Sequence, residues 1–286
     1  MENREVVRGE RTFNPREKAN RVLFPLPLQY FLGGPTRAGM VAASVMTQPS
    51  PTPAWGHYER LLPAEIEAIC ARHPVAYLPW GALEYHGQHA AIGLDGLKAH
   101  ALCAALAQAA GGLVLPPLYV AANTIKTLRD LSHRRHSLNF SEETLRALAR
   151  EHLDQLADER FRVVFVLCGH VGQPHYDIVK DEARQFNARQ SATHAIVTSE
   201  CDLLPPDLVK VNHAAFGEIS FLLHSHPECV DLARLPADRV PTLEQDAVWG
   251  PDPREASAVK GRLYTAAFVA TAAKLVATAR TPPSPA

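Results

Sequence analysis

The sequence predicts an α/β protein, a three-layer α/β/α single domain centred on a parallel sheet. Strand-like and helix-like segments alternate from residue 60 onward, as they do in successive βαβ units. The run RVVFVLCGH (162–170) is apolar without interruption, which is typical of a central parallel strand. Polar clusters follow two of the expected strands directly, and ligands gather at the carboxyl ends of strands in such sheets.

The elements expected in the first half of the chain alternate in the same way. The segment 59–73 predicts a helix with Pro63 near its start, and VAYLPWG (75–81) predicts a short buried strand. The Ala-rich, amphipathic segment 94–110 predicts a second helix, and GLVLPPLYV (112–120) predicts a second strand.

The second half continues the pattern from a helix over 141–159. There Ser141 is expected to cap the helix, with Glu143 or Thr144 near the position that completes a capping box. The strand at 162–170 follows. The remaining expectations are a helix at 174–190, a strand at 195–200 and helices at 213–226 and 261–280.

Residues 1–55 differ from the rest and predict an N-terminal extension that is poorly ordered, with the folded domain at 56–286. The extension opens with alternating charges and ends in MTQPSPTPAW. Its apolar stretch resembles a signal peptide only superficially, because Pro25 and Pro27 interrupt it and acidic residues stand among the basic ones before it.

Charge and cysteine content narrow the possible partners. A formal net charge of -1 provides no basic field, so we expect neither a nucleic acid nor a membrane as partner and favour a small-molecule substrate. The five cysteines are odd in number and form no C-x-x-C pair, which argues against a disulfide framework and against a thiolate zinc site. We therefore expect reduced thiols and a cytoplasmic location.

Potential metal ligands gather in GALEYHGQHAAIGLDG (81–96). Glu84 and His86 are two positions apart, so an extended backbone directs both side chains to one face. His89 and Asp95 follow within the same segment, and His170 ends the strand 162–170 between glycines. Carboxylates and imidazoles bind zinc, manganese or iron without thiolates. The alternatives are a salt-bridged Glu84, hydrogen-bonded histidines and Asp95 as a helix N-cap.

These segments resemble the motifs of the creatininase (creatinine amidohydrolase) family. LPWGALEYHGQHAAIGLDG is similar to the family's L-P-x-G-S-x-E-Q-H-G-x-H-L-P-L-x-T-D, and CGHVGQ is similar to its N-G-H-G-G-N. NHAAFGEIS and VWGPDPREASAVKG resemble its H-A-G-x-x-E-T-S and V-W-G-D-P-x-x-A-S-A-E-K-G motifs. The four motifs occur in the family's order over about residues 60 to 278, which leaves the first 55 residues outside the resemblance.

The resemblance implies two divalent metal ions per chain (Zn, Mn or Fe) and a metal-activated water that attacks an amide carbon. Asp95 is the implied bridge between the ions, and His89 is expected to orient a ligand. His213 is the candidate catalytic proton carrier, the alternative being a structural histidine that caps a helix beginning at Ala214. The resemblance also implies a homo-oligomer, such as a hexamer. The implied metal ligands are Glu84, His86, Asp95, His170 and Glu218.

Departures from the family motifs bear on the substrate. Gly172 stands where true creatininases carry a glutamate, which argues against creatinine itself. The segment between Pro117 and Glu142 also differs from the family's pattern, and its basic residues suggest a carboxylate-bearing ligand, the alternative being a solvated loop. These basic residues are Arg129, Arg134 and Arg135. Other family positions are replaced by Tyr85, Leu94, Cys168, Val171 and Gln173.

The predicted function is a metal-dependent amidohydrolase that cleaves a C–N bond, other than a peptide bond, in a cyclic amide, a formamide or a similar small molecule. Two alternatives remain open. One is a peptidase acting on a small cofactor-precursor peptide, and the other is a catalytically inactive family member used as a binding protein. All five expected ligand positions keep ligating side chains, which favours an enzyme.

Overall fold

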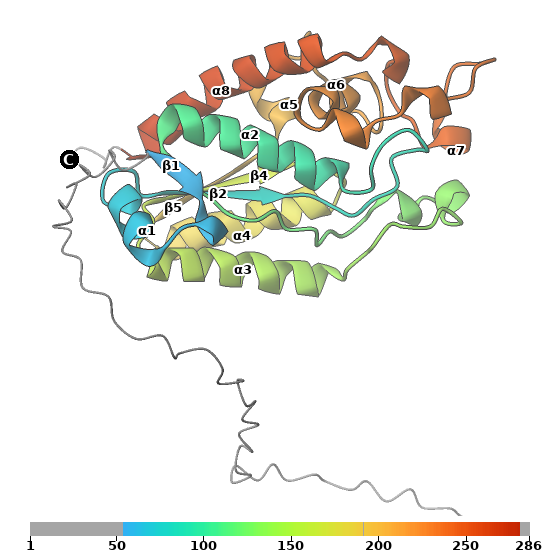
Figure 1. Cartoon of the computed structure of the whole chain (residues 1–286). Helices are drawn as coiled ribbons and strands as arrows, with labels where there is room; N and C mark the ends of the chain where they lie inside the picture. The colour runs from blue at the N-terminus through green and yellow to red at the C-terminus, as the bar shows by residue number, and fades with distance from the viewer. Residues whose placement is uncertain (1–53, 191, 281–286) are drawn as a thin grey trace, which may run out of the picture. The chain divides into compact units, whose positions relative to one another are not determined.

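A parallel five-stranded sheet organises the chain, as a computed structural model that describes residues 54–190 and 192–280 shows (Figure 1). The strand order is β1-β3-β2-β4-β5, with every neighbouring pair parallel. This confirms the predicted fold class. The strands are β1 (Trp55–His57), β2 (Val75–Trp80), β3 (Gly112–Val114), β4 (Val163–Cys168) and β5 (His194–Thr198).

Helices cover both faces of the sheet and complete the three layers (Figure 1). One face packs against α1 (Pro63–Cys70), α3 (Glu142–Asp158) and α4 (His175–Arg189), and the other packs against α2 (Leu94–Ala110) and α8 (Ala258–Arg280). Helix α6 (Phe216–Ser225) packs against α8 and α2. The short helices are α5 (Glu200–Leu203), α7 (Leu243–Asp246) and the 3₁₀ turns Tyr58–Arg60, Ile125–Thr127, Arg129–Leu131, Pro227–Cys229, Leu232–Arg234 and Pro253–Glu255.

Strand β2 shows why a central strand reads as a continuous apolar run. All six of its residues are buried, because alternate side chains enter opposite layers. Ala76, Leu78 and Trp80 belong to the core that contains α3 and α4. Val75 and Tyr77 belong to the core that contains α2 and α8.

Helix α3 begins with the cap that the sequence predicts. The Ser141 hydroxyl accepts a hydrogen bond of 3.1 Å from the Thr144 amide, so Ser141 is the N-cap as predicted. The Thr144 hydroxyl lies 2.9 Å from the Ser141 hydroxyl and not on the Ser141 amide, so the reciprocal bond of the predicted capping box is not formed. Glu142 and Glu143 lie in the first turn, where the helix dipole favours negative charge.

Several predicted boundaries are wrong, including that of the last helix, which begins at Ala258 and not at 261. The strand expected at 112–120 ends at Val114, since Pro116 and Pro117 have no amide hydrogen to continue the ladder. The helix expected from residue 59 begins at Pro63, after a separate 3₁₀ turn. The helix expected from His213 begins at Phe216, because residue 213 pairs with the backbone of Trp249 instead.

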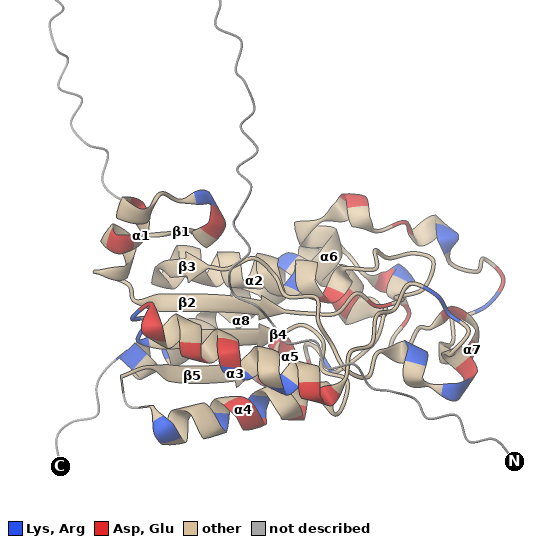
Figure 2. Ribbon diagram, turned by 90° about the horizontal axis from the view of Figure 1, so that it is seen from below, with Lys and Arg blue, Asp and Glu red and all other residues tan. Residues whose placement is uncertain are grey.

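Edge strand β1 was not predicted, and it begins at Trp55, the last residue of the expected extension. Residues 1–53 lie outside the described residues, so the predicted extension and its poor order stay a prediction. Within the described ranges, no helix combines the length and the apolar character needed to cross a bilayer. Lys, Arg, Asp and Glu are interspersed along α3 and α4 on the side drawn in Figure 2, without a patch of one sign on those helices.

Candidate metal centre

The candidate centre lies at the carboxyl edge of the sheet, where the first turn of α2 meets the ends of β2 and β4. Two glycines permit this approach. A Cβ on Gly81 would lie 2.2 Å from the Gly96 amide nitrogen, and a Cβ on Gly169 would lie 2.2 Å from the Asp95 carbonyl oxygen. Both distances are too short for any side chain, so glycine at these positions lets Asp95 sit directly beside the strand ends.

The segment before α6 brings the remaining side chains to the same edge. His213 exchanges two backbone hydrogen bonds with Trp249, at 2.8 and 2.9 Å, which hold the segment extended. Ala214 then adopts a φ of 52°, and Glu218 follows in the first turn of α6. The side-chain oxygen of Asn212 accepts a 3.3 Å hydrogen bond from the Glu218 amide and so fixes the start of the helix.

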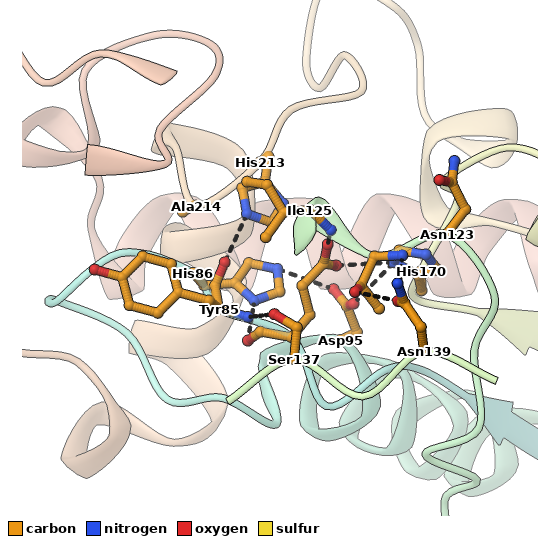
Figure 3. A network of polar contacts seen from close by, with 12 residues as sticks. Tyr85, His86, Asp95, Asn123, Ile125, Ser137, Asn139, His170, His213 and Ala214 are labelled. Carbon is orange, nitrogen blue, oxygen red and sulfur yellow. Dashed lines mark hydrogen bonds and ion pairs between the residues drawn. The ribbon is translucent and has the colours of Figure 1, made fainter. Parts of the chain in front are cut away.

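Asp95 joins two histidines at the middle of the cluster (Figure 3). Its Oδ1 lies 3.3 Å from Nε2 of His86, and its Oδ2 lies 3.3 Å from Nδ1 of His170. On one side, Nδ1 of His170 is also 3.0 Å from Oε2 of Glu84. On the other side, Nε2 of His86 is 3.7 Å from Oε2 of Glu218.

Hydrogen bonds hold both outer carboxylates, Glu84 through one oxygen and Glu218 through both. Oε1 of Glu84 accepts a short hydrogen bond from the Ile125 amide, which leaves Oε2 for the cluster. Oε1 of Glu218 accepts a 2.9 Å hydrogen bond from Nζ of Lys98, and its Oε2 accepts a 2.8 Å hydrogen bond from the Ala214 amide. These bonds orient the carboxylates before any ligand arrives.

The arrangement forms two groups of three ligands that share Asp95. One group is Glu84, Asp95 and His170, and the other is His86, Asp95 and Glu218, with the ligand atoms of each group within 4.8 Å of one another. Nε2 of His86 and Oδ2 of Asp95 are buried and make no hydrogen bond. Unpaired polar atoms in a buried set of carboxylates and imidazoles fit zinc, manganese or iron.

The orientation of His86 also fits a ligand. Its Nδ1 donates a hydrogen bond of 3.0 Å to the Glu84 carbonyl oxygen, and this directs Nε2 at the cluster. Burial lowers the pKa of His86, but Asp95, Glu218 and Glu84 outweigh burial and raise that pKa to about 9. Burial likewise raises the pKa of Asp95, but His86 and His170 hold it well below its usual range. The negative electrostatic potential of these carboxylates, which retains a proton on His86, also attracts a metal cation.

His213 lies over His86, with ring centroids 4.2 Å apart (Figure 3). Its Nε2 is 3.0 Å from the Tyr85 carbonyl oxygen, so a neutral ring carries its proton there and has a free lone pair on Nδ1. Burial and the neighbouring His86 lower the pKa of His213, which keeps the ring neutral near pH 7. His213 does not cap α6, since the N-cap position is Ala215.

The structure thus brings together all six candidate site residues, and it gives His89 a backbone role. Nε2 of His89 lies 2.8 Å from the Ala214 carbonyl oxygen, which fixes the residue whose amide donates to Glu218. Sequence reasoning missed Lys98 and Glu200, both buried behind Glu218. The signal for Lys98 was its position three residues after Asp95 on an Ala- and Leu-rich helix, where a charged side chain is unexpected.

A cavity of about 360 Å³ opens onto the cluster. The polar side chains near it are engaged elsewhere: Asn123 donates to the Gln173 carbonyl, and Asn212 holds the start of α6. Among the described residues that line the cavity there is no Lys or Arg, so the basic loop does not reach it. Arg134 instead lies over the Tyr85 ring, 5.5 Å from its centroid. The apolar lining residues are Ile125, Leu128, Val171, Val211, Leu243 and Trp249.

The structure leaves no space at Gly172 for the glutamate that true creatininases carry at this position. A Cβ at this position would lie 2.8 Å from Nε2 of His170 and 2.9 Å from the Asn123 carbonyl oxygen. A glutamate therefore has no room there without movement of the backbone or of His170. The group of Glu84, Asp95 and His170 consequently lacks the further carboxylate that the family resemblance associates with creatinine hydrolysis.

The fold and the cluster define a class: three-layer α/β proteins with a candidate two-ion centre at the carboxyl edge of a parallel sheet. The sequence profile of the creatininase family, described as creatinine amidohydrolase, matches residues 59–276, and the chain belongs to this family.

Individual relatives are more distant. A creatinine amidohydrolase of Pseudomonas putida is 25% identical over 189 residues, which are 60% of this chain and 72% of the relative. A crystal structure of creatinine amidohydrolase (creatininase) has a TM-score of 0.63 at 24% identity and covers 81% of this chain and 99% of its own. The structure titled "Creatininase Mn" has a TM-score of 0.61 at 24% identity, covering 79% and 98%. Structural likeness at this identity shows the shared fold.

Proposed function

We propose that the protein is a metal-dependent amidohydrolase that cleaves a C–N bond in a small molecule, with two divalent ions per chain. The observation that carries the proposal is the position of Asp95, whose two oxygens face the imidazoles of two separate three-ligand groups. A carboxylate shared in this way suits a pair of ions. Family membership and the relative from Pseudomonas putida support the same reaction class.

Glu84, Asp95 and His170 would hold one ion, and His86, Asp95 and Glu218 would hold the other. Bound ions supply an activated water and polarise the amide carbonyl. The protein contributes fixed ligand directions, because the Ile125 and Ala214 amides and Lys98 orient the outer carboxylates. It also leaves both groups facing a cavity that admits a small molecule.

His213 is the proposed proton carrier for the leaving nitrogen. Its ring is neutral near pH 7, and its free Nδ1 can accept a proton from the attacking water and return it to the amine. The backbone bonds to Trp249 and the contact with the Tyr85 carbonyl keep the ring in place during this transfer. His213→Asn is expected to lower kcat by about 100-fold or more while the metal content stays unchanged.

The cavity favours an uncharged substrate with an apolar portion. Ile125, Leu128 and Val171 face it, and its described lining offers no cation for a carboxylate. We therefore propose small neutral amides, cyclic amides or formamides as substrates, in preference to the carboxylate-bearing ligand that the basic loop suggests. The cytoplasmic location and the homo-oligomer also remain proposals, the former supported by five free cysteines.

Hydroxamates of matched size test this proposal, because the hydroxamate group chelates metal ions and stands in for the hydrolysed amide. Benzohydroxamate should bind the zinc-loaded or manganese-loaded protein at least about tenfold more tightly than its para-carboxylate derivative, since the carboxylate would be desolvated without a partner. Hydrolysis of neutral amides and formamides by the same loaded protein should accompany this binding. Cleavage of short peptides but not of small amides would favour the peptidase, and chelation without any hydrolysis would favour a binding protein.

A further inference from the structure

Lys98 is an unusual residue for the interior of an α/β domain. Its side chain is 1% exposed, and Glu200, which accepts a short hydrogen bond from its Nζ, is 3% exposed. Lysine and glutamate are almost never fully buried unless they are paired. Oxygens of both Glu200 and Glu218 accept hydrogen bonds from Nζ of Lys98, so the buried ammonium is paired with two carboxylates.

The ammonium links the two carboxylates in an ordered way. Glu218 presents Oε1 to Lys98 at 2.9 Å and turns Oε2 toward His86, at 3.7 Å. Glu200, the first residue of α5 after β5, accepts from the same ammonium through Oε1, while its Oε2 makes no hydrogen bond. Lys98 stands one helical turn after Asp95, so α2 supplies both a candidate ligand and the group that orients another.

Stability alone does not explain this pair. Two buried charges lose their hydration, and replacing such a pair by apolar residues of similar volume is often neutral or stabilising. Apolar residues, among them Leu102 and Phe221, line the small cavity beside Lys98 and would pack against an apolar chain. Lys98 does not line the cavity of about 360 Å³ that opens onto the cluster, so it has no path to a substrate.

We propose that Lys98 is a positioning residue, backed by Glu200, that holds Oε1 of Glu218 so that its other oxygen, Oε2, completes the ion site formed with His86 and Asp95. The inference rests on the proposed function, because it concerns the second of the two ions. Glu200 balances the charge of Lys98, so the pair adds direction without adding net charge. The other ion site, formed by Glu84, Asp95 and His170, has no contact with Lys98 among the described hydrogen bonds and ion pairs.

Calorimetric titration of the metal-stripped protein with Zn²⁺ tests the proposal. The wild type should bind in two steps, and Lys98→Met should keep one step while the other weakens by about 10–100-fold. The double variant Lys98→Met/Glu200→Leu removes the whole pair, so Glu200 is not left as a buried charge without its ammonium, which guards against misfolding of the single variant. Both variants should lose the same step that Glu218→Gln loses. Lys180→Met, at an exposed helical lysine, is the matched control.

The outcomes separate this inference from the proposed function. Two unchanged binding steps in Lys98→Met and in the double variant, with native circular dichroism, would overturn the positioning role alone. Equal weakening of both binding steps would also overturn the positioning role. That result would show a general structural effect of Lys98, which weakens both ion sites and not one. A wild-type protein that takes up no Zn²⁺ would overturn the proposed function and this inference together.

Discussion

Helices α2 and α3 have the same length, 17 residues, but use their polar residues in opposite ways. In α3 the polar residues face solvent and Ser141 caps the first turn. In α2 there is no side-chain cap, and the charged residues Asp95 and Lys98 are each 1% exposed. Burying a charge costs free energy unless the charge is paired, so the buried charges destabilise α2 unless they have partners. The solvent-facing charges of α3 have no such cost.

The difference shows where the chain stabilises its fold and where it builds a site. Helix α3 follows the rules of an amphipathic helix, with an apolar stripe on the sheet and charges outside. Helix α2 directs its first turn at the carboxyl edge of the sheet, between glycines that admit its backbone. Substitutions on α2 should therefore impair function, and substitutions on α3 should change only stability.

The largest expected effect is that of Asp95→Asn. This change removes the shared carboxylate from both three-ligand groups, so amide hydrolysis by the metal-supplemented protein should fall by at least about a thousandfold. The control is Asp177→Asn, which changes an exposed aspartate in the first turn of α4 and should leave the rate within about twofold. Full activity in the Asp95 variant would show that α2 does not carry the chemistry.

Glu84→Gln and Glu218→Gln should sharpen the comparison by affecting one group each. Glutamine keeps the size of the side chain but loses the charge, so each variant is expected to bind one ion about 100-fold more weakly and to retain the other. Competition with a metal-sensitive dye would resolve the two affinities. Loss of both ions in both variants would contradict the division into two groups.

A smaller effect is expected at the cap of α3. Ser141→Ala removes the hydroxyl that accepts from the Thr144 amide, so the free energy of unfolding should fall by about 1 kcal/mol. That corresponds to a decrease of about 2–4 °C in the thermal midpoint, measured by circular dichroism. Metal affinity and hydrolysis should not change, and a loss of metal affinity would mean that α3 also supports the site.

The smallest expected effect is that of Asp154→Asn on the outer face of α3. Asp154 pairs with Arg189 at 2.7 Å, but the two side chains are 42% and 45% exposed. Solvent screens such a pair, so its loss should cost about 0.5 kcal/mol or less. Chemical denaturation would measure this loss in the free energy of unfolding, with Lys180→Met as a second surface control. A loss above about 2 kcal/mol would show that the pair contributes substantially to stability.

The hydrophobic periodicity of the sequence predicted the three layers of the fold. The family motifs named most of the residues that the structure places in the candidate site. The apolar run at 162–170 and the amphipathic segment at 94–110 correspond to β4 and α2, because their patterns record which faces are covered. The three-residue strand β1 was not predicted, since such a short edge strand leaves too few positions for a pattern.

Contacts between side chains that are far apart in the sequence could not be predicted. Lys98 and Glu200 are separated by 102 positions, and the sequence does not show that these two side chains pair. The basic loop illustrates the opposite error: Arg134 looks available to a ligand in the sequence, but it lies over Tyr85 and donates to the Gln245 carbonyl. Composition reveals that a charge exists, and only the fold shows where its partner lies.

The most direct test of the central claim is the metal content per chain, measured by elemental analysis of wild type and Asp95→Ala purified without chelator. The account predicts about two divalent ions per wild-type chain and a sharp decrease in the variant, because Asp95 belongs to both ligand groups. Less than about a tenth of an ion in the wild type, with no uptake of added zinc or manganese, would contradict a two-ion amidohydrolase.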